Sequence, residues 1–227
     1  MKHVVFLTGA GMSAESGINT FRDNGGLWEQ YNVMDVASVD GWHKNPSLVQ
    51  KFYNERRKQL KKTEANEGHK LIAELEKKFK VTVITQNVDN LHERAGSSHV
   101  VHLHGELTKA CNESKTEVID IGYRDIEADE RAKDGSRLRP FIVWFGEAVP
   151  LIEKAVHLVM NADIVVIIGT SMQVYPAAAL INYAKKDARL FLIDPNDVEM
   201  YLPRVEIIKE KASVGMRILK EKLFFGS

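Results

Sequence analysis

Four short apolar segments, rich in β-branched residues, most constrain how this chain of 227 residues can fold. Nearly continuous apolar runs of this length are typical of strands buried on both faces of a parallel sheet. The segments are His3–Thr8, Val81–Thr85, Ile164–Ile168 and Leu190–Ile193. Helical patterns separate them, at Pro46–Lys62, Gly68–Lys78, Leu151–Met160, Pro176–Lys185 and Ala212–Lys222. Alternating strands and helices predict an α/β fold with a Rossmann-like, doubly wound parallel sheet.

Two stretches interrupt this alternation and predict a small lobe made of two insertions. Residues 26–67 are mostly helical in pattern, and residues 108–138 are polar and weakly patterned. At about 150 residues per domain, the length allows one body with a lobe of this kind. We therefore expect a single domain over 1–227, with a body of about 1–25, 68–107 and 139–227.

Composition excludes several classes of protein. The 31 basic residues balance the 31 acidic ones, which argues against a chain held to nucleic acid by charge. The single cysteine, Cys111, excludes an internal disulfide and any multi-cysteine metal site within the chain. Since no apolar stretch approaches the ~18 residues of a membrane span, we expect a cytoplasmic protein with no membrane contact, either a monomer or a weak dimer.

Polar clusters follow the first three of these strands, where open α/β sheets bind ligands. The first cluster, Gly9-Ala10-Gly11-Met12-Ser13-Ala14-Glu15-Ser16-Gly17, is a glycine-rich turn that opens a helix. Glycines let backbone N–H groups approach a pyrophosphate, and a helix N-terminus favours negative charge. By itself this turn indicates either a nucleotide site or an ordinary strand-to-helix turn.

Five further motifs follow along the chain and strengthen the indication of a nucleotide site. They are Gly17-Ile18-Asn19-Thr20-Phe21-Arg22, Thr85-Gln86-Asn87-Val88-Asp89-Asn90-Leu91-His92, His102-Leu103-His104-Gly105-Glu106, Arg139-Pro140-Phe141-Ile142-Val143-Trp144-Phe145-Gly146-Glu147 and Gly169-Thr170-Ser171-Met172-Gln173-Val174-Tyr175-Pro176-Ala177. With the glycine-rich turn, the set resembles a sirtuin, an NAD-dependent protein-lysine deacylase, from Val4 to about Ala188. It is most similar to the bacterial sirtuins.

The resemblance implies that NAD is a consumed co-substrate and that acylated protein lysines are the partners. The lysine acyl oxygen would displace nicotinamide, and the products would be nicotinamide, free lysine and O-acyl-ADP-ribose. His104 would be the general base, acting with Asn87 and Asp89. The implied NAD contacts are Gly9, Ala10, Gly11, Ser13, Ala14, Gly17, Phe21, Arg22, Trp28, Gln86, Asn87, Val88, Asp89, Gly169, Thr170, Ser171, Asp194 and Ala212. Val143, Phe145, Gly146 and Glu147 would bind substrate as an added strand.

Each motif also has a purely structural interpretation. His102 and His104 alternate with apolar residues on a short strand and could be structural. Asn87 and Asp89 could cap a helix that starts near Asn90. The segment Gly169–Ser171 could be an ordinary turn.

The helix Pro46–Lys62 carries a signal for the acyl group. Leu48, Phe52 and Leu60 follow a four-residue spacing, and Arg56 occupies the position between Phe52 and Leu60 where the pattern would place an apolar residue. Tyr53 shares this face, so a phenol and a guanidinium could together receive a carboxylate. The pair resembles the Tyr-x-x-Arg signature of sirtuins that remove succinyl and malonyl groups. Alternatively, Arg56 extends to solvent or pairs with a glutamate, and Arg57 with Lys58, Lys61 and Lys62 forms a solvated face.

The sequence departs from the sirtuin pattern at three places. Sirtuins commonly hold a structural zinc with four cysteines, whereas the interval Leu107–Leu138 contains only Cys111, so we predict no zinc. The counterpart of the usual ribose-binding asparagine is Leu192 or Asp194, of which we favour Asp194. Asn19 stands where many sirtuins have proline.

Two other functions remain as alternatives. A sirtuin-like ADP-ribosyltransferase or NAD hydrolase would use the same site, although Tyr53 and Arg56 favour an acidic acyl group. A non-catalytic ADP-ribose binder would have no need of His104, Asn87 and Asp89 together.

Overall fold

The computed structural model describes residues 1–18, 30–170, 177–196 and 204–225. The parallel sheet has six strands in the order β3-β2-β1-β7-β8-β9. Their bounds are β1 His3–Thr8, β2 Lys80–Thr85, β3 Val100–His102, β7 Ile164–Ile168, β8 Arg189–Ile193 and β9 Val205–Ile208. The expected doubly wound sheet is confirmed. β3 contains His102, which the sequence analysis placed on a short strand, and β9 is a strand that it did not predict.

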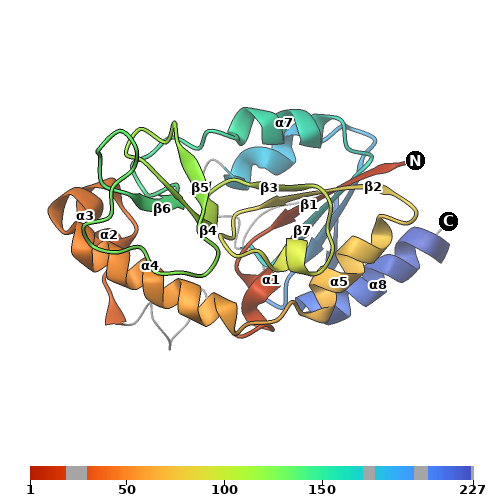
Figure 1. Cartoon of the computed structure of the whole chain (residues 1–227). Helices are drawn as coiled ribbons and strands as arrows, with labels where there is room; N and C mark the ends of the chain where they lie inside the picture. The colour runs from red at the N-terminus through yellow and green to blue at the C-terminus, as the bar shows by residue number, and fades with distance from the viewer. Residues whose placement is uncertain (19–29, 171–176, 197–203, 226–227) are drawn as a thin grey trace.

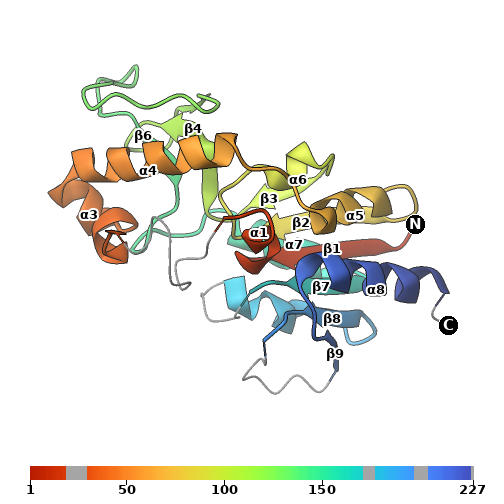
Figure 2. The ribbon, with the colours of Figure 1, turned by 90° about the horizontal axis from the view of Figure 1, so that it is seen from below.

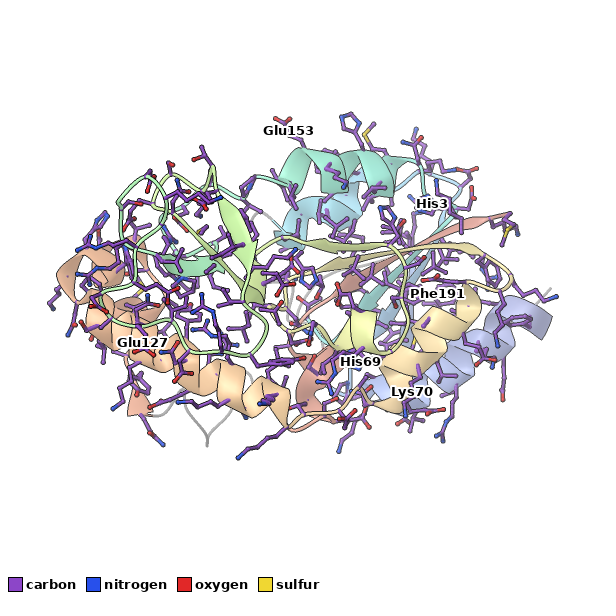
Figure 3. The ribbon with its side chains drawn as sticks, in the orientation of Figure 1. His3, His69, Lys70, Glu127, Glu153 and Phe191 are labelled. Atoms are coloured by element: carbon purple, nitrogen blue, oxygen red, sulfur yellow. The ribbon has the colours of Figure 1, made fainter. Side chains whose placement is uncertain are left out.

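Helices cover both faces of this sheet (Figure 1). The strand pleat explains why, because Val4 and Phe6 of β1 join one apolar cluster and Val5 and Leu7 join the other. α5 (Glu67–Leu75) and α8 (Ala212–Phe225) pack on the first cluster, whereas α7 (Ile152–Met160) and the 3₁₀ helix η2 (Ala177–Tyr183) pack on the second. Figure 3 shows Phe191, which belongs to the first apolar cluster, and Glu153, which extends outward from α7.

A separate group of elements lies beyond the carboxyl edge of the sheet (Figure 2). It combines the three-stranded antiparallel sheet β5-β4-β6 with helices α2 to α4. The bounds are α2 Val33–Val36, α3 Val39–Lys44, α4 Pro46–Lys61, β4 Gly105–Cys111, β5 Val118–Asp120 and β6 Arg139–Ile142. Two short helices, α1 (Gly11–Ala14) and α6 (Leu91–Arg94), follow β1 and β2. The residue boundaries expected for the small lobe stay a prediction.

Two expected helices differ from the structure. The helix expected over Gly68–Lys78 is α5, which ends at Leu75 because the backbone turns there to enter β2. The helix expected over Pro176–Lys185 is the tighter η2, and Pro176 lies outside the described residues. None of the helices in the described ranges is long and apolar enough to cross a membrane.

Candidate active site

Three loops meet at the carboxyl edge of the parallel sheet, after β1, β2 and β7. The backbone N–H of Gly11 donates to the carbonyl of Gly169 over 2.8 Å. A Cβ on Gly9 would lie 2.7 Å from Gly169 O, and a Cβ on Gly11 would lie 2.6 Å from Gly169 Cα. The glycines are therefore required for two loops to pack backbone against backbone.

Ser13, Asn87 and Asp89 join the first two loops through side chains. The Asn87 amide donates to Gly9 O over 3.0 Å and contacts Ser13 Oγ at 3.1 Å, and that hydroxyl donates to Asp89 Oδ2 over 2.9 Å. Asp89 Oδ1 also accepts from the N–H of Leu91, the first residue of α6, whereas Asn90 at the N-cap position makes no side-chain capping hydrogen bond. Burial raises the pKa of Asp89, while its hydrogen bonds partly offset this.

His104 lies in the turn between β3 and β4. Its Nδ1 is 3.0 Å from the carbonyl of Gln86, which can only accept, so the proton of a neutral ring sits on Nδ1. The lone pair is then on Nε2. Because burial lowers the pKa of His104, the ring is neutral at neutral pH and suited to act as a general base.

Tyr53, Arg56 and Trp144 are the side chains of the candidate acyl-binding site. The indole N–H of Trp144 donates to the Tyr53 hydroxyl over 3.0 Å, a contact that the sequence analysis missed although it quoted the motif containing Trp144. The Arg56 guanidinium carbon lies 5.9 Å from the centre of the Tyr53 ring and 5.8 Å from that of Phe52. Burial raises the pKa of Tyr53, so its hydroxyl keeps its proton.

Trp144 is held in turn by a buried ion pair. Arg139 stacks 3.6 Å from the centre of the Trp144 ring, and Glu147 accepts from Arg139 at 3.0 and 3.2 Å. Lys115 contacts the same carboxylate at 2.8 Å. The Glu147 side chain is thus occupied within the protein.

The segment expected to pair with a substrate strand is largely hydrogen-bonded already. The N–H groups of Val143 and Phe145 donate to His104 O and Ala37 O, both over 2.9 Å, and the N–H of Trp144 donates to Glu147. The N–H of Gly146 has no partner among the described residues. Pairing with a substrate strand therefore stays a prediction, and Gly146 is its best-placed donor.

Some of the remaining predicted NAD contacts lie in the described part of the chain, and others do not. Gln86 contacts Thr170 at 3.3 Å, which connects the loops after β2 and β7. Asp194 follows β8 and accepts from Asn196, and Ala212 is the buried first residue of α8. Ala10 directly precedes α1, Ala14 is its last residue and Gly17 follows it, and Val88 lies between Asn87 and Asp89. Phe21, Arg22, Trp28 and Ser171 lie outside the described residues, as does Asn19.

Cys111 lies buried in β4, with its sulfur 3.9 Å from Pro140 O. Burial raises the pKa of the thiol to about 11, so it is not a ready metal ligand. Within the part of the chain that the structure describes, no three His, Cys, Asp or Glu side chains are grouped to hold a metal ion. The absence of zinc stays a prediction.

Comparisons with known proteins define the class to which this fold and site belong. The model of the Sir2 family matches residues 9–176. The chain is 36% identical to a Sir2 homologue solved with ADP-ribose, with a TM-score of 0.88 over 99% of this chain and 94% of the other. A Sir2 homologue solved with NAD gives 37% identity and a TM-score of 0.87 over 98% and 91%. The chain belongs to the Sir2 family.

Two of its relatives match over nearly the full length of this chain. The NAD-dependent protein deacylase of Bacteroides thetaiotaomicron is 56% identical, over 98% of both chains. The protein of the same name from Helicobacter pylori is 53% identical, again over 98% of both.

Proposed function

We propose that this chain is an NAD-dependent protein-lysine deacylase that accepts succinyl and malonyl groups as well as acetyl groups. Membership of the Sir2 family and full-length relatives named as deacylases support the reaction. The glycine-lined junction of three loops lies at the carboxyl edge of the parallel sheet, where doubly wound folds bind dinucleotides. NAD supplies a labile bond to nicotinamide and the ADP-ribose that receives the acyl group.

The residues at this junction take distinct roles in the proposal. His104 removes a proton from a ribose hydroxyl through its free Nε2, because Gln86 holds the other nitrogen. Asn87, Val88 and Asp89 bind the nicotinamide carboxamide. The expected setting is the cytoplasm, and the expected partners are acylated lysines of proteins, with no nucleic acid and no more than weak dimerisation.

One observation carries the choice of acyl group: the Trp144 N–H donates to the Tyr53 oxygen. An indole cannot accept a hydrogen bond, so the phenol proton must point elsewhere. Arg56, on the same face of α4, presents further donors and no acceptor. A buried hydroxyl donor beside a guanidinium matches a carboxylate, as at the end of a succinyl group. The same pair disfavours an ADP-ribosyltransferase or an NAD hydrolase, neither of which needs it.

Arg56→Met tests this assignment. The thioether keeps much of the side-chain volume and removes the charge, so kcat/KM for a succinyl-lysine peptide should fall roughly 10- to 100-fold. The rate on the matched acetyl-lysine peptide should stay within about twofold. Lys58→Met, on the exposed side of the same helix, is the control. Equal losses on both peptides would refute selective recognition of the carboxylate.

A further inference from the structure

His102, at the end of β3, lies between two groups that accept hydrogen bonds. Its Nδ1 is 3.1 Å from the carbonyl oxygen of Asn87, and its Nε2 is 2.7 Å from Glu93 Oε1 in α6. A peptide carbonyl has no proton to give, and the contact with His102 lowers the pKa of Glu93. A neutral imidazole carries one N–H, so both contacts are satisfied only when the ring and the carboxylate together hold an extra proton.

We propose that the protonated His102–Glu93 pair is a clamp on the Asn87 carbonyl that positions the segment carrying Asn87 and Asp89 for NAD binding. His102 is a positioning residue, because it acts through Asn87 and reaches none of the reacting atoms. The inference rests on the proposed role of Asn87 and Asp89 toward NAD.

The clamp reaches the glycine-rich turn through a continuous set of hydrogen bonds. The same Asn87 whose carbonyl is held donates its amide to Gly9 O over 3.0 Å. It also contacts Ser13, which donates to Asp89. Releasing the carbonyl therefore loosens the residue that fixes the turn against the sheet.

The surroundings of His102 favour its charged form. The side chain is 7% exposed, whereas that of Glu93 is 40% exposed, so the pair has one side open to water. Glu106 and Asp89 are the other acidic groups that attract the ring, and Lys109 is paired with Glu106 at 2.7 Å. His92, from α6, is neutral because burial lowers its pKa well below the ordinary histidine range.

The direction of the pH effect follows. Glu93 raises the pKa of His102 against the opposing effect of burial. The clamp is intact below that raised pKa and is lost as the pH rises through it. NAD affinity should thus weaken on the alkaline side. His104, whose pKa is lowered, should instead limit kcat on the acid side.

Glu93→Gln is the matched variant. Its amide can donate to a bare Nε2 while Nδ1–H stays on the Asn87 carbonyl, so the clamp no longer needs the proton. Between pH 7 and pH 9, the Kd of the wild type for NAD should rise about fivefold, the value of one hydrogen bond, and that of Glu93→Gln should stay flat. His102→Phe should weaken NAD binding at every pH.

Nitrogen-15 NMR of the histidine rings tests the protonation itself. At pH 7, both ring nitrogens of His102 should carry protons in the wild type. In Glu93→Gln, only one of them should. A neutral His102 in the wild type, or parallel NAD-binding profiles in the two proteins, would overturn the inference. Asn87→Ala separates the two proposals, because unchanged NAD affinity in that variant would reject the NAD role of Asn87 while the NMR result still decides whether His102 is charged.

Discussion

Arg56 and Arg57 are neighbours in α4 with opposite surroundings. Arg56 is half-buried beside the rings of Phe52 and Tyr53, whereas Arg57 is fully buried. Arg57 donates to the carbonyls of Arg124 and Leu107. Four-residue spacing identified Arg56. The alternative that placed Arg57 with three lysines on a solvated face is wrong for Arg57, although the lysines are exposed. Its partners are backbone carbonyls of later segments, and these have no signature in the sequence.

Trp144→Phe tests how the Tyr53 hydroxyl is directed. The ring that stacks on Arg139 remains, and the N–H donor to Tyr53 is removed. KM for a succinyl-lysine peptide should rise roughly fivefold, with the acetyl-lysine peptide little affected. Trp42→Phe is the control, because the Trp42 N–H donates to Glu113 instead. Equal effects of the two substitutions on the succinyl peptide would contradict the role of Trp144.

At the scale of elements, α4 anchors the segment Leu107–Leu138, where the sequence departs from the zinc-binding pattern common in sirtuins. Gln50 donates to Leu138 O over 2.7 Å, and the Asn54 amide exchanges two hydrogen bonds of 3.0 Å with the Ile126 backbone. These residues and Arg57 recur at four- and three-residue spacing, on one face of the helix. A small apolar cluster of Ala110, Ile121, Ile126 and Leu138 completes the contact region.

Periodicity predicted the elements that bury a long apolar face and missed those that do not. The strands β1 and β7 match their expected bounds because all their residues are buried between two helical layers. β3 and β9 have three and four residues, too few to show a period. β5 is a short strand with two exposed residues out of three. Its pairing with β4 therefore defines it more than the hydrophobic pattern of its own residues does.

Arg57→Met tests the anchoring role of α4. The substitution removes the donor to the carbonyls of Leu107 and Arg124 and one of the donors to Asn54 Oδ1, so the free energy of unfolding should fall by about 3 kcal/mol. Lys58→Met is the neighbouring control: its ion pair with Asp125 is exposed and should contribute less than about 1 kcal/mol. Urea unfolding measures both, and equal losses would contradict the anchoring role.

At the scale of the whole molecule, two buried histidines connect the helices α5 and α6 with strand β1 of the parallel sheet. His69 of α5 and His92 of α6 have ring centres 4.8 Å apart, and His92 Nε2 lies 3.2 Å from Thr8 Oγ1 of β1. Figure 3 shows His69 near the start of α5, with Lys70 directed outward beside it. Both ring nitrogens of His69 are buried without a hydrogen-bond partner in the described structure. Burial lowers the pKa of His69 to about 4.

This pair should make the fold sensitive to acid. The pKa of His69 falls from 6.5 to about 4 on folding, so the unfolded chain binds more protons between these values. Stability should therefore be lost as the pH falls from about 6.5 to about 4, by about 3 kcal/mol for His69 alone. His69→Phe should flatten this part of the stability profile measured by urea unfolding, and His43→Gln, at an exposed site, should not. An unchanged slope in His69→Phe would reject His69 as the titrating group.

Mass spectrometry of the products formed from a succinyl-lysine peptide and NAD tests the central claim most directly. The account predicts free lysine peptide, nicotinamide and O-succinyl-ADP-ribose in equal amounts, with the last product reduced by Arg56→Met. ADP-ribose on protein, or free ADP-ribose with the succinyl group still on the peptide, would identify a transferase or a hydrolase and contradict the account.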